Sequence, residues 1–105
     1  MSKILITGGA GFIGTALAYS LNKLGHKISL IDRDKCFSTD HRKYDKYEID
    51  IRQSSNLDEI KDKKFDFIFH LAAQTSSLIS QENPELDVDT NVKGTLNICN
   101  CARNW

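Results

Sequence analysis

"ILITGGAGFIG", residues 4–14, joins a short apolar run to a loop that contains four glycines. The apolar run is typical of a buried parallel strand. The glycines fit either of two spacings, Gly8-x-x-Gly11-x-x-Gly14 or Gly9-x-Gly11-x-x-Gly14. In both, one glycine permits a tight turn, a second lets a pyrophosphate approach the backbone, and a third lets the next helix pack closely. The stretch therefore predicts a strand, a phosphate-binding loop and a helix.

The residues after the loop change from strand-like to helical spacing. Apolar side chains recur at helical intervals from residue 13 to residue 24, which predicts an amphipathic helix that ends at Gly25. The stripe expected to face the core consists of Ile13, Ala16, Leu17, Leu21 and Leu24. The unpaired N–H groups and partial positive charge at the start of such a helix attract phosphate. Loop and helix together predict a site for a dinucleotide pyrophosphate.

An acidic residue, Asp32, follows the second predicted strand, residues 27–31. It comes about 20 residues after the glycine loop, where a carboxylate binds the ribose hydroxyls of an adenosine. The same carboxylate repels a 2′-phosphate, so NAD is the predicted cofactor. The neighbouring Arg33 favours the alternative, NADP, because a guanidinium can accommodate that phosphate.

The remaining elements are expected in the order strand, short helix, strand, long helix. They are predicted over residues 47–51, 55–61, 65–71 and 83–103, after an irregular polar crossover over residues 33–43. This alternation predicts an α/β fold with a Rossmann-like, doubly wound parallel sheet. Right-handed crossovers give the strand order 3-2-1-4, a sheet truncated after its fourth strand.

Local signals support these boundaries. A pattern like a capping box over residues 55–58 opens the short helix, and Asn83 with Pro84 begins the long one. The fourth strand is apolar on both faces, which predicts helices on both sides of it. The buried stripe expected on the last helix consists of Leu86, Val88, Val92, Leu96 and Cys99.

The charge balance and the cysteines weigh against several classes of protein. The chain has 105 residues, the size of one domain over residues 1–105, with 14 basic and 14 acidic residues. Zero net charge weighs against a nucleic-acid partner. No apolar run approaches the ~18 residues of a membrane span, so a cytoplasmic protein without a membrane partner is expected. Cys99 and Cys101 would lie about 200° apart on a helix, so no metal site is predicted.

Four motifs together resemble one family. They are TGGAGFIG (7–14), DIR (50–52), HLAAQ (70–74) and NPELDVDTNVKGTLN (83–97). In this order and spacing they resemble the extended short-chain dehydrogenase/reductase family, and within it the NAD-dependent nucleotide-sugar epimerases and dehydratases. The resemblance spans essentially the whole chain. It implies a nucleotide-sugar substrate that is transiently oxidised by hydride transfer to NAD.

The resemblance also implies roles for individual residues. The glycine loop would hold the pyrophosphate, Asp50 and Ile51 would contact the adenine, and Asn91 would position the backbone near the cofactor. Residues 71–73 would line the route to the nicotinamide, with Gln74 near the substrate end. Arg33 included, the predicted cofactor-binding residues are Gly8, Gly11, Phe12, Ile13, Gly14, Asp32, Arg33, Asp50, Ile51, Leu71, Ala72, Ala73, Gln74 and Asn91. For Asp50, a capping or surface acid is the alternative.

Other polar residues are interpreted as structural. His70 lies on a predicted buried strand, where a histidine usually satisfies its own hydrogen bonds, so a packed residue is favoured over a base. Ser76, Ser77 and Ser80 are interpreted as polar loop residues, with contact to a sugar as the alternative.

No catalytic residue is predicted in this chain. The family uses a Tyr-x-x-x-Lys pair with a Ser or Thr, after the fourth strand and its helix. Tyr19 and Lys23 have this spacing, but they belong to the first helix, too far along its axis to reach a nicotinamide. The favoured interpretation is the NAD-binding portion of a longer enzyme. The alternatives are a stand-alone dinucleotide-binding module and an interaction domain, with a homodimer through the last helix or the open sheet edge.

Overall fold

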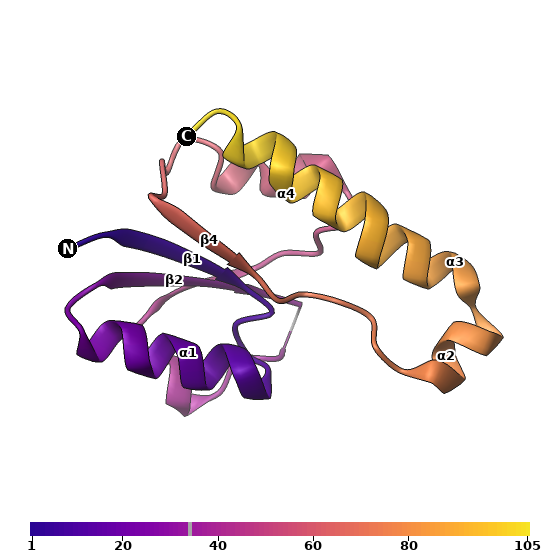
Figure 1. Ribbon diagram of the computed structural model, residues 1–105, viewed down its shortest axis with the longest axis horizontal. Helices are drawn as coiled ribbons and strands as arrows, with labels where there is room; N and C mark the ends of the chain where they lie inside the picture. The colour runs from indigo at the N-terminus through magenta and orange to yellow at the C-terminus, as the bar shows by residue number, and fades with distance from the viewer. Residues whose placement is uncertain (34) are drawn as a thin grey trace.

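A four-stranded parallel sheet forms the centre of the molecule (Figure 1). The computed structural model describes residues 1–33 and 35–105. The strands are β1 (Lys3–Thr7), β2 (Lys27–Asp32), β3 (Asp45–Glu48) and β4 (Phe67–His70). They lie in the order β3-β2-β1-β4, which confirms the predicted Rossmann-like arrangement. Thr7 pairs with both Ile31 and His70, so the carboxyl ends of β1, β2 and β4 meet at one edge.

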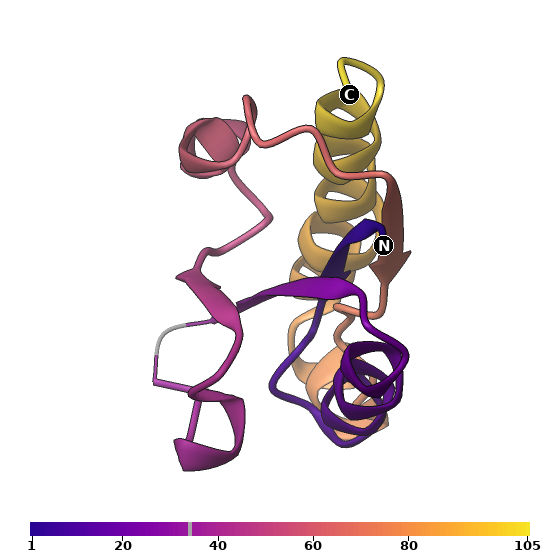
Figure 2. The same cartoon turned by 90° about the vertical axis from the view of Figure 1, so that its left-hand side faces the viewer.

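Helical segments cover both faces of the sheet (Figures 1 and 2). One face carries α4 (Gly94–Ala102) and the 3₁₀ segment η2 (Ser54–Glu59), and the other carries α1 (Phe12–Lys23) and the 3₁₀ segment η1 (Thr39–His41). Alternating strand residues supply the two cores. The α4 face buries Leu5, Ile31, Ile49, Ile51, Leu57, Ile60, Phe65, Ile98 and Cys101, and the α1 face buries Ile4, Ile6, Ala18, Ile28, Leu30 and Tyr44.

α1 packs through smaller residues than the sequence pattern predicts. Its fully buried residues are Gly14 and Ala18, one helical turn apart. Of the expected stripe, Leu17 and Leu21 pack against the core, whereas Ile13, Ala16 and Leu24 are exposed. The helix lies so close to β1 and the loop that only small side chains fit between them. It ends as predicted before Gly25, which has a φ of +93°.

The elements after β2 differ from the prediction in detail. β3 begins two residues earlier than expected, and Ile49 and Ile51 enter the core beyond its end. The predicted capping box at residues 55–58 is wrong, because η2 starts after Gln53 without a side-chain cap among the described residues. The Asn56 amide instead donates to the Asp50 carbonyl oxygen, at 3.0 Å. Of the crossover, residue 34 lies outside the described residues.

The C-terminal helix is continuous in Figure 1 but contains a wider turn. α3 (Pro84–Asp87) runs through a π-helical segment, η3 (Val88–Lys93), into α4. Pro84 occupies the first turn as predicted, although the Asn83 side chain makes no capping hydrogen bond in the described chain. A short helix that the sequence did not reveal, α2 (Ser77–Glu82), precedes it and is capped by the Ser76 hydroxyl.

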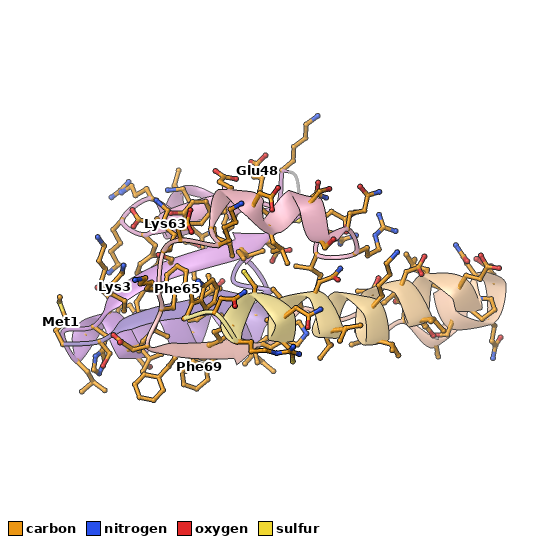
Figure 3. All side chains as sticks on the ribbon, turned by 90° about the horizontal axis from the view of Figure 1, so that it is seen from above. Met1, Lys3, Glu48, Lys63, Phe65 and Phe69 are labelled. Atoms are coloured by element: carbon orange, nitrogen blue, oxygen red, sulfur yellow. The ribbon has the colours of Figure 1, made fainter. Side chains whose placement is uncertain are left out.

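Two apolar surfaces contradict the predicted burial. The α4 residues that face the core are Gly94, Asn97, Ile98 and Cys101. Most of the predicted stripe points to solvent, with Val88 56%, Val92 64% and Leu96 54% exposed. β4 is covered on the α4 face only: Ile68 packs against the core, whereas Phe67 and Phe69 are exposed. Figure 3 shows Phe69 projecting away from the body of the molecule. In the part of the chain that the structure describes, no helix is long and apolar enough to cross a membrane.

Candidate nucleotide-binding site

The glycine loop follows β1 at the edge where the strands' carboxyl ends meet. Gly8 has a φ of +67°, which L side chains rarely adopt. A Cβ atom on Gly8 would lie 2.9 Å from the Leu71–Ala72 peptide, and one on Gly14 would lie 2.4 Å from the Gly8 carbonyl oxygen. The loop closes through a 3.1 Å hydrogen bond from the Gly11 N–H to Gly8. Gly8 and Gly14 thus occupy the turn and packing positions of the first predicted spacing, and a Cβ on Gly9, of the second spacing, would also lie only 2.8 Å from the Leu30 side chain.

α1 begins directly after this loop with its backbone donors open. Gly11 is the N-cap, and the described first turn carries neither a side-chain cap nor an acidic residue. Phe12 and Ile13 are 94% and 68% exposed, so their side chains leave the start of the helix accessible. A twelve-residue helix with free N–H groups beside a glycine turn is suited to bind an anion.

Asp32 is fixed against the glycine loop. Its carboxylate accepts hydrogen bonds from the Ala10 N–H, at 2.9 Å, and from the Arg33 N–H, at 2.8 Å. Each oxygen uses one of its lone pairs in this way and keeps another for a further donor. The structure thus brings the loop and the predicted ribose-binding carboxylate together, with the exposed Arg33 beside them.

Asp50 forms a partly exposed ion pair with Arg52. Its carboxylate receives the Arg52 Nε at 2.9 and 3.0 Å, the Arg52 Nη2 at 2.5 Å and the Arg52 N–H at 3.0 Å. This pairing holds the pKa of Asp50 below its usual range, and the nearby Arg33 guanidinium lowers it further. The Ile51 side chain is buried, and its carbonyl oxygen accepts from the Asn97 amide at 2.8 Å. Asp50 therefore lies near the Arg33 end of the site as an ionised carboxylate.

The segment after β4 is held from both sides. The N–H groups of Leu71 and Ala72 donate to the Thr7 hydroxyl, at 3.1 and 3.2 Å. Asn91 and the Gln74 backbone exchange two hydrogen bonds, of 2.8 and 3.0 Å. Ala73 is exposed between these anchors. Asn91 thus holds the backbone of the segment at Gln74.

The Gln74 side chain is occupied within the protein. Its amide nitrogen contacts Asp87, the Ser76 carbonyl oxygen and the Ser80 hydroxyl, and its amide oxygen accepts from the Ser76 N–H. The serines interpreted as loop residues therefore belong to α2 and its cap. Gln74 joins this helix to α3.

Thr7, Thr95 and His41 were not predicted as site residues, but each forms a hydrogen bond beside the site. Thr7 and Thr95 each hydrogen-bond a ring nitrogen of His70, and burial lowers the pKa of that histidine. His41, which is only 3% exposed, joins the crossover to Thr15 of α1 at 2.9 Å. The signal for His41 was a Ser-x-x-His spacing, in which histidine replaces the usual Glu or Gln of a capping box.

A cavity of about 690 Å³ opens between the start of α1 and the crossover. Its lining includes Ala10, Gly11, Phe12, Cys36 and Ser38, so it adjoins the glycine loop and continues toward the middle of α1. This volume is within the range of small-molecule sites. The cavity thus lies between α1 and the crossover, and Asp32, Arg33, Asp50 and Ile51 are not part of its lining.

The pair with Tyr-x-x-x-Lys spacing, Tyr19 and Lys23, lies on the side of α1 that faces the crossover. The ammonium groups of Lys23 and Lys43 lie 5.6 and 5.3 Å from the centre of the Tyr19 ring, on the crossover side of α1. Tyr19 thus faces the crossover and not the segment after β4. Among the described residues, no group of three His, Cys, Asp or Glu side chains could hold a metal ion.

Comparison with known proteins identifies the family. The model of the NAD dependent epimerase/dehydratase family matches residues 4–104. A putative UDP-glucose 4-epimerase of Methanocaldococcus jannaschii is 34% identical over 107 residues, which cover 97% of this chain and 34% of that protein. Similar relatives are also matched over only about a third of their length.

Solved structures of epimerases have a similar fold over nearly the whole of this chain. The NAD complex of Thermus thermophilus UDP-glucose 4-epimerase superposes with a TM-score of 0.83 at 27% identity, over 96% of this chain and 33% of that one. The UDP-glucose complex of the Thermotoga maritima UDP-glucose 4-epimerase gives a TM-score of 0.86 at 32% identity, over 95% of this chain and 33% of that one. Because the family model covers nearly the whole chain, this chain belongs to the NAD dependent epimerase/dehydratase family.

Proposed function

We propose that residues 1–105 form one NAD-binding unit of a nucleotide-sugar epimerase or dehydratase. The observation that carries the proposal is the Gly8 turn, which packs on the Leu71–Ala72 peptide while Asp32 accepts a hydrogen bond from the next part of the loop. This arrangement leaves the start of α1 free for a pyrophosphate and a carboxylate beside it for the ribose.

The proposed cofactor site runs along the edge where the strands end. Gly8, Gly11, Phe12, Ile13 and Gly14 bind the pyrophosphate through their backbone. Asp32 binds the adenosine ribose, and Asp50 with Ile51 borders the adenine. Leu71, Ala72 and Ala73 lead to the nicotinamide, and Asn91 holds Gln74 at the far end. NAD is favoured over NADP because the Asp32 carboxylate repels a 2′-phosphate. NADP stays the alternative because the exposed Arg33 guanidinium can accommodate that phosphate.

The proposed reaction oxidises a nucleotide sugar transiently. NAD supplies the hydride acceptor when it is bound. The residues of this chain bind and orient that cofactor, and the proposal assigns none of them as acid or base, because Tyr19 lies on the crossover side of α1. The relatives named as UDP-glucose 4-epimerases support a nucleotide sugar as the substrate class.

We further propose a homodimer and a cytoplasmic location. The exposed apolar residues Val88, Val92 and Leu96 recur every fourth position along one face of the last helix, the pattern of a helix that packs against a partner. The open edge of β4 is the second candidate surface. Three cysteines outside any disulfide suit a reducing compartment, and zero net charge supports the absence of a nucleic-acid partner.

Titration calorimetry of this chain with NAD and NADP tests the proposal. We expect NAD to bind with a Kd of roughly 0.1–5 mM and more tightly than NADP. Asp32→Ala should weaken NAD binding and reduce the preference for NAD, whereas the control Asp62→Ala, at an exposed loop position, should change neither. A folded chain that binds neither nucleotide would contradict the proposed function.

A further inference from the structure

His70 lies where three parts of the candidate site meet. It is the last residue of β4, and its Nδ1 is 2.6 Å from the Thr7 hydroxyl at the end of β1. Its Nε2 is 2.9 Å from the Thr95 hydroxyl of α4. The His70 ring therefore connects β1, the strand before the glycine loop, with α4. Asn91 lies in η3, the segment directly before α4.

The neighbouring donors determine where each proton lies. The Thr7 hydroxyl oxygen accepts from two backbone N–H groups, those of Leu71 and Ala72, so its own proton is available for the His70 Nδ1. The Thr95 hydroxyl donates to the Asn91 carbonyl oxygen at 2.6 Å, so it accepts from the His70 Nε2–H. The chain of hydrogen bonds runs in one direction and needs the neutral Nε2–H tautomer of His70.

This chain connects the two backbone segments that would contact the cofactor. The Gly8 turn packs on the Leu71–Ala72 peptide, whose N–H is one of the two that donate to Thr7, and a Cβ on Gly8 would lie only 2.9 Å from that peptide. Asn91 lies at the other end of this hydrogen-bond chain, where its carbonyl oxygen is the last acceptor. Its side chain also holds the Gln74 backbone. A change at His70 therefore acts on both ends of residues 71–74.

We propose that His70 is a positioning residue for the nicotinamide end of the NAD site. It holds the Gly8 turn and residues 71–74 in register through Thr7 and Thr95, as the neutral Nε2–H tautomer. The proposal rests on the proposed function, because it concerns the same cofactor site. It assigns His70 no contact with substrate or cofactor.

The surroundings of the ring keep it neutral. Burial lowers the pKa of His70. The charged residues on or next to the elements around the ring are Lys3, Asp66, Asp89, Lys93 and Arg103, and none of these described groups contributes to that shift. A proton added at Nδ1 would face the Thr7 oxygen, which already accepts two N–H groups, so protonation would break the chain at Thr7.

The tautomer is measured by ¹⁵N NMR of the chain labelled at histidine. We expect His70 to show the neutral Nε2–H pattern at neutral pH. In Thr95→Val, which removes the acceptor for Nε2–H at nearly constant shape, this pattern should weaken, whereas Thr95→Ser should restore it. A protonated ring or the Nδ1–H tautomer in the unsubstituted chain would overturn the proposal.

Nucleotide affinity separates positioning from a general loss of structure. We expect Thr95→Val to bind NAD about tenfold more weakly and AMP, which uses only the adenosine end, as tightly as before, with Thr95→Ser close to the unsubstituted chain. Unchanged NAD affinity, or an equal loss for NAD and AMP, would overturn the role of His70. If the unsubstituted chain binds neither nucleotide, the proposed function is overturned instead. This result is obtained before any substitution is made, so the two failures can be told apart.

Discussion

Gly8 adopts a backbone conformation with positive φ while its Cα packs against another peptide. The positive φ disfavours a side chain, and the close packing leaves no room for one. Gly8→Ala should therefore destabilise the fold by about 2 kcal/mol and abolish NAD binding. Urea unfolding and NAD titration measure the two effects.

Gly25 provides a matched control for that substitution. It also has a positive φ, but apart from Gly25 itself and its two chain neighbours, no described residue has an atom within 4 Å of a Cβ built on it. Gly25→Ala should cost about 1 kcal/mol and leave NAD affinity unchanged. If the two alanine variants weaken NAD binding equally, the close packing of the Gly8 turn is not what shapes the site.

Arg52 controls the ionisation of Asp50. Because Arg52 lowers the pKa of Asp50 in the folded state, the pair adds stability above the ordinary carboxylate pKa, and this contribution is lost as the pH falls through the folded pKa. Arg52→Gln should raise the Asp50 pKa toward its ordinary value. Carboxylate titration by NMR checks this, and an unchanged midpoint would show that the pairing is absent in solution.

The last helix has one buried and one exposed apolar face, so substitutions on the two faces should differ in their effect on stability. Ile98 is 3% exposed and Leu96 is 54% exposed. Ile98→Ala should therefore cost about 3 kcal/mol in unfolding free energy, and Leu96→Ala less than about 0.5 kcal/mol. Urea denaturation of the two variants measures this, and the reverse order would mean that the helix presents its other face to the sheet.

The junction of β1, β4 and α4 should respond to acid through His70. Its folded pKa is lowered, so stability is complete above the unfolded pKa of about 6.5 and decreases as the pH falls below it toward the folded pKa. Urea unfolding at about pH 7.5 and pH 5.5 should show this loss, and His70→Gln should reduce it. An equal loss in His70→Gln would assign the acid sensitivity to other groups.

Several elements could be predicted because their signals are local. The glycine spacing and helical period from residue 4 to residue 24 predicted β1, the loop and α1, and Asp32 was placed beside the loop. The periodicity of apolar residues could not predict whether an apolar helix face packs against the sheet or faces solvent. Val88, Val92 and Leu96 form a regular stripe, but it faces solvent, and Asn97 with Ile98 contacts the core instead.

The hydrogen-bond chains around the site could not be predicted for a different reason. Thr7, His70 and Thr95 are distant in sequence and meet only when β4 pairs with β1 and the last helix packs beside them. His41 and Thr15 likewise meet through the crossover. Such contacts depend on tertiary structure, and no spacing along the chain indicates them.

At the scale of the whole molecule, the exposed face of the last helix predicts self-association. Val92→Glu introduces a charge into this apolar face and should shift the chain toward monomer in sedimentation velocity without destabilising it. Leu78→Glu, at a 64% exposed position on α2, is the matched control and should have no effect. A chain that is monomeric before substitution, or that responds equally to both changes, would contradict a dimer through this helix.

An NMR titration of the ¹⁵N-labelled chain with NAD tests the cofactor site at the Gly8 turn. We expect amide shifts at residues 8–14, at Asp32 and along residues 71–74, with little change on the exposed face of the last helix. A folded spectrum in which the glycine-loop amides do not respond to NAD, or shifts confined to residues 88–96, would contradict a cofactor site at the Gly8 turn.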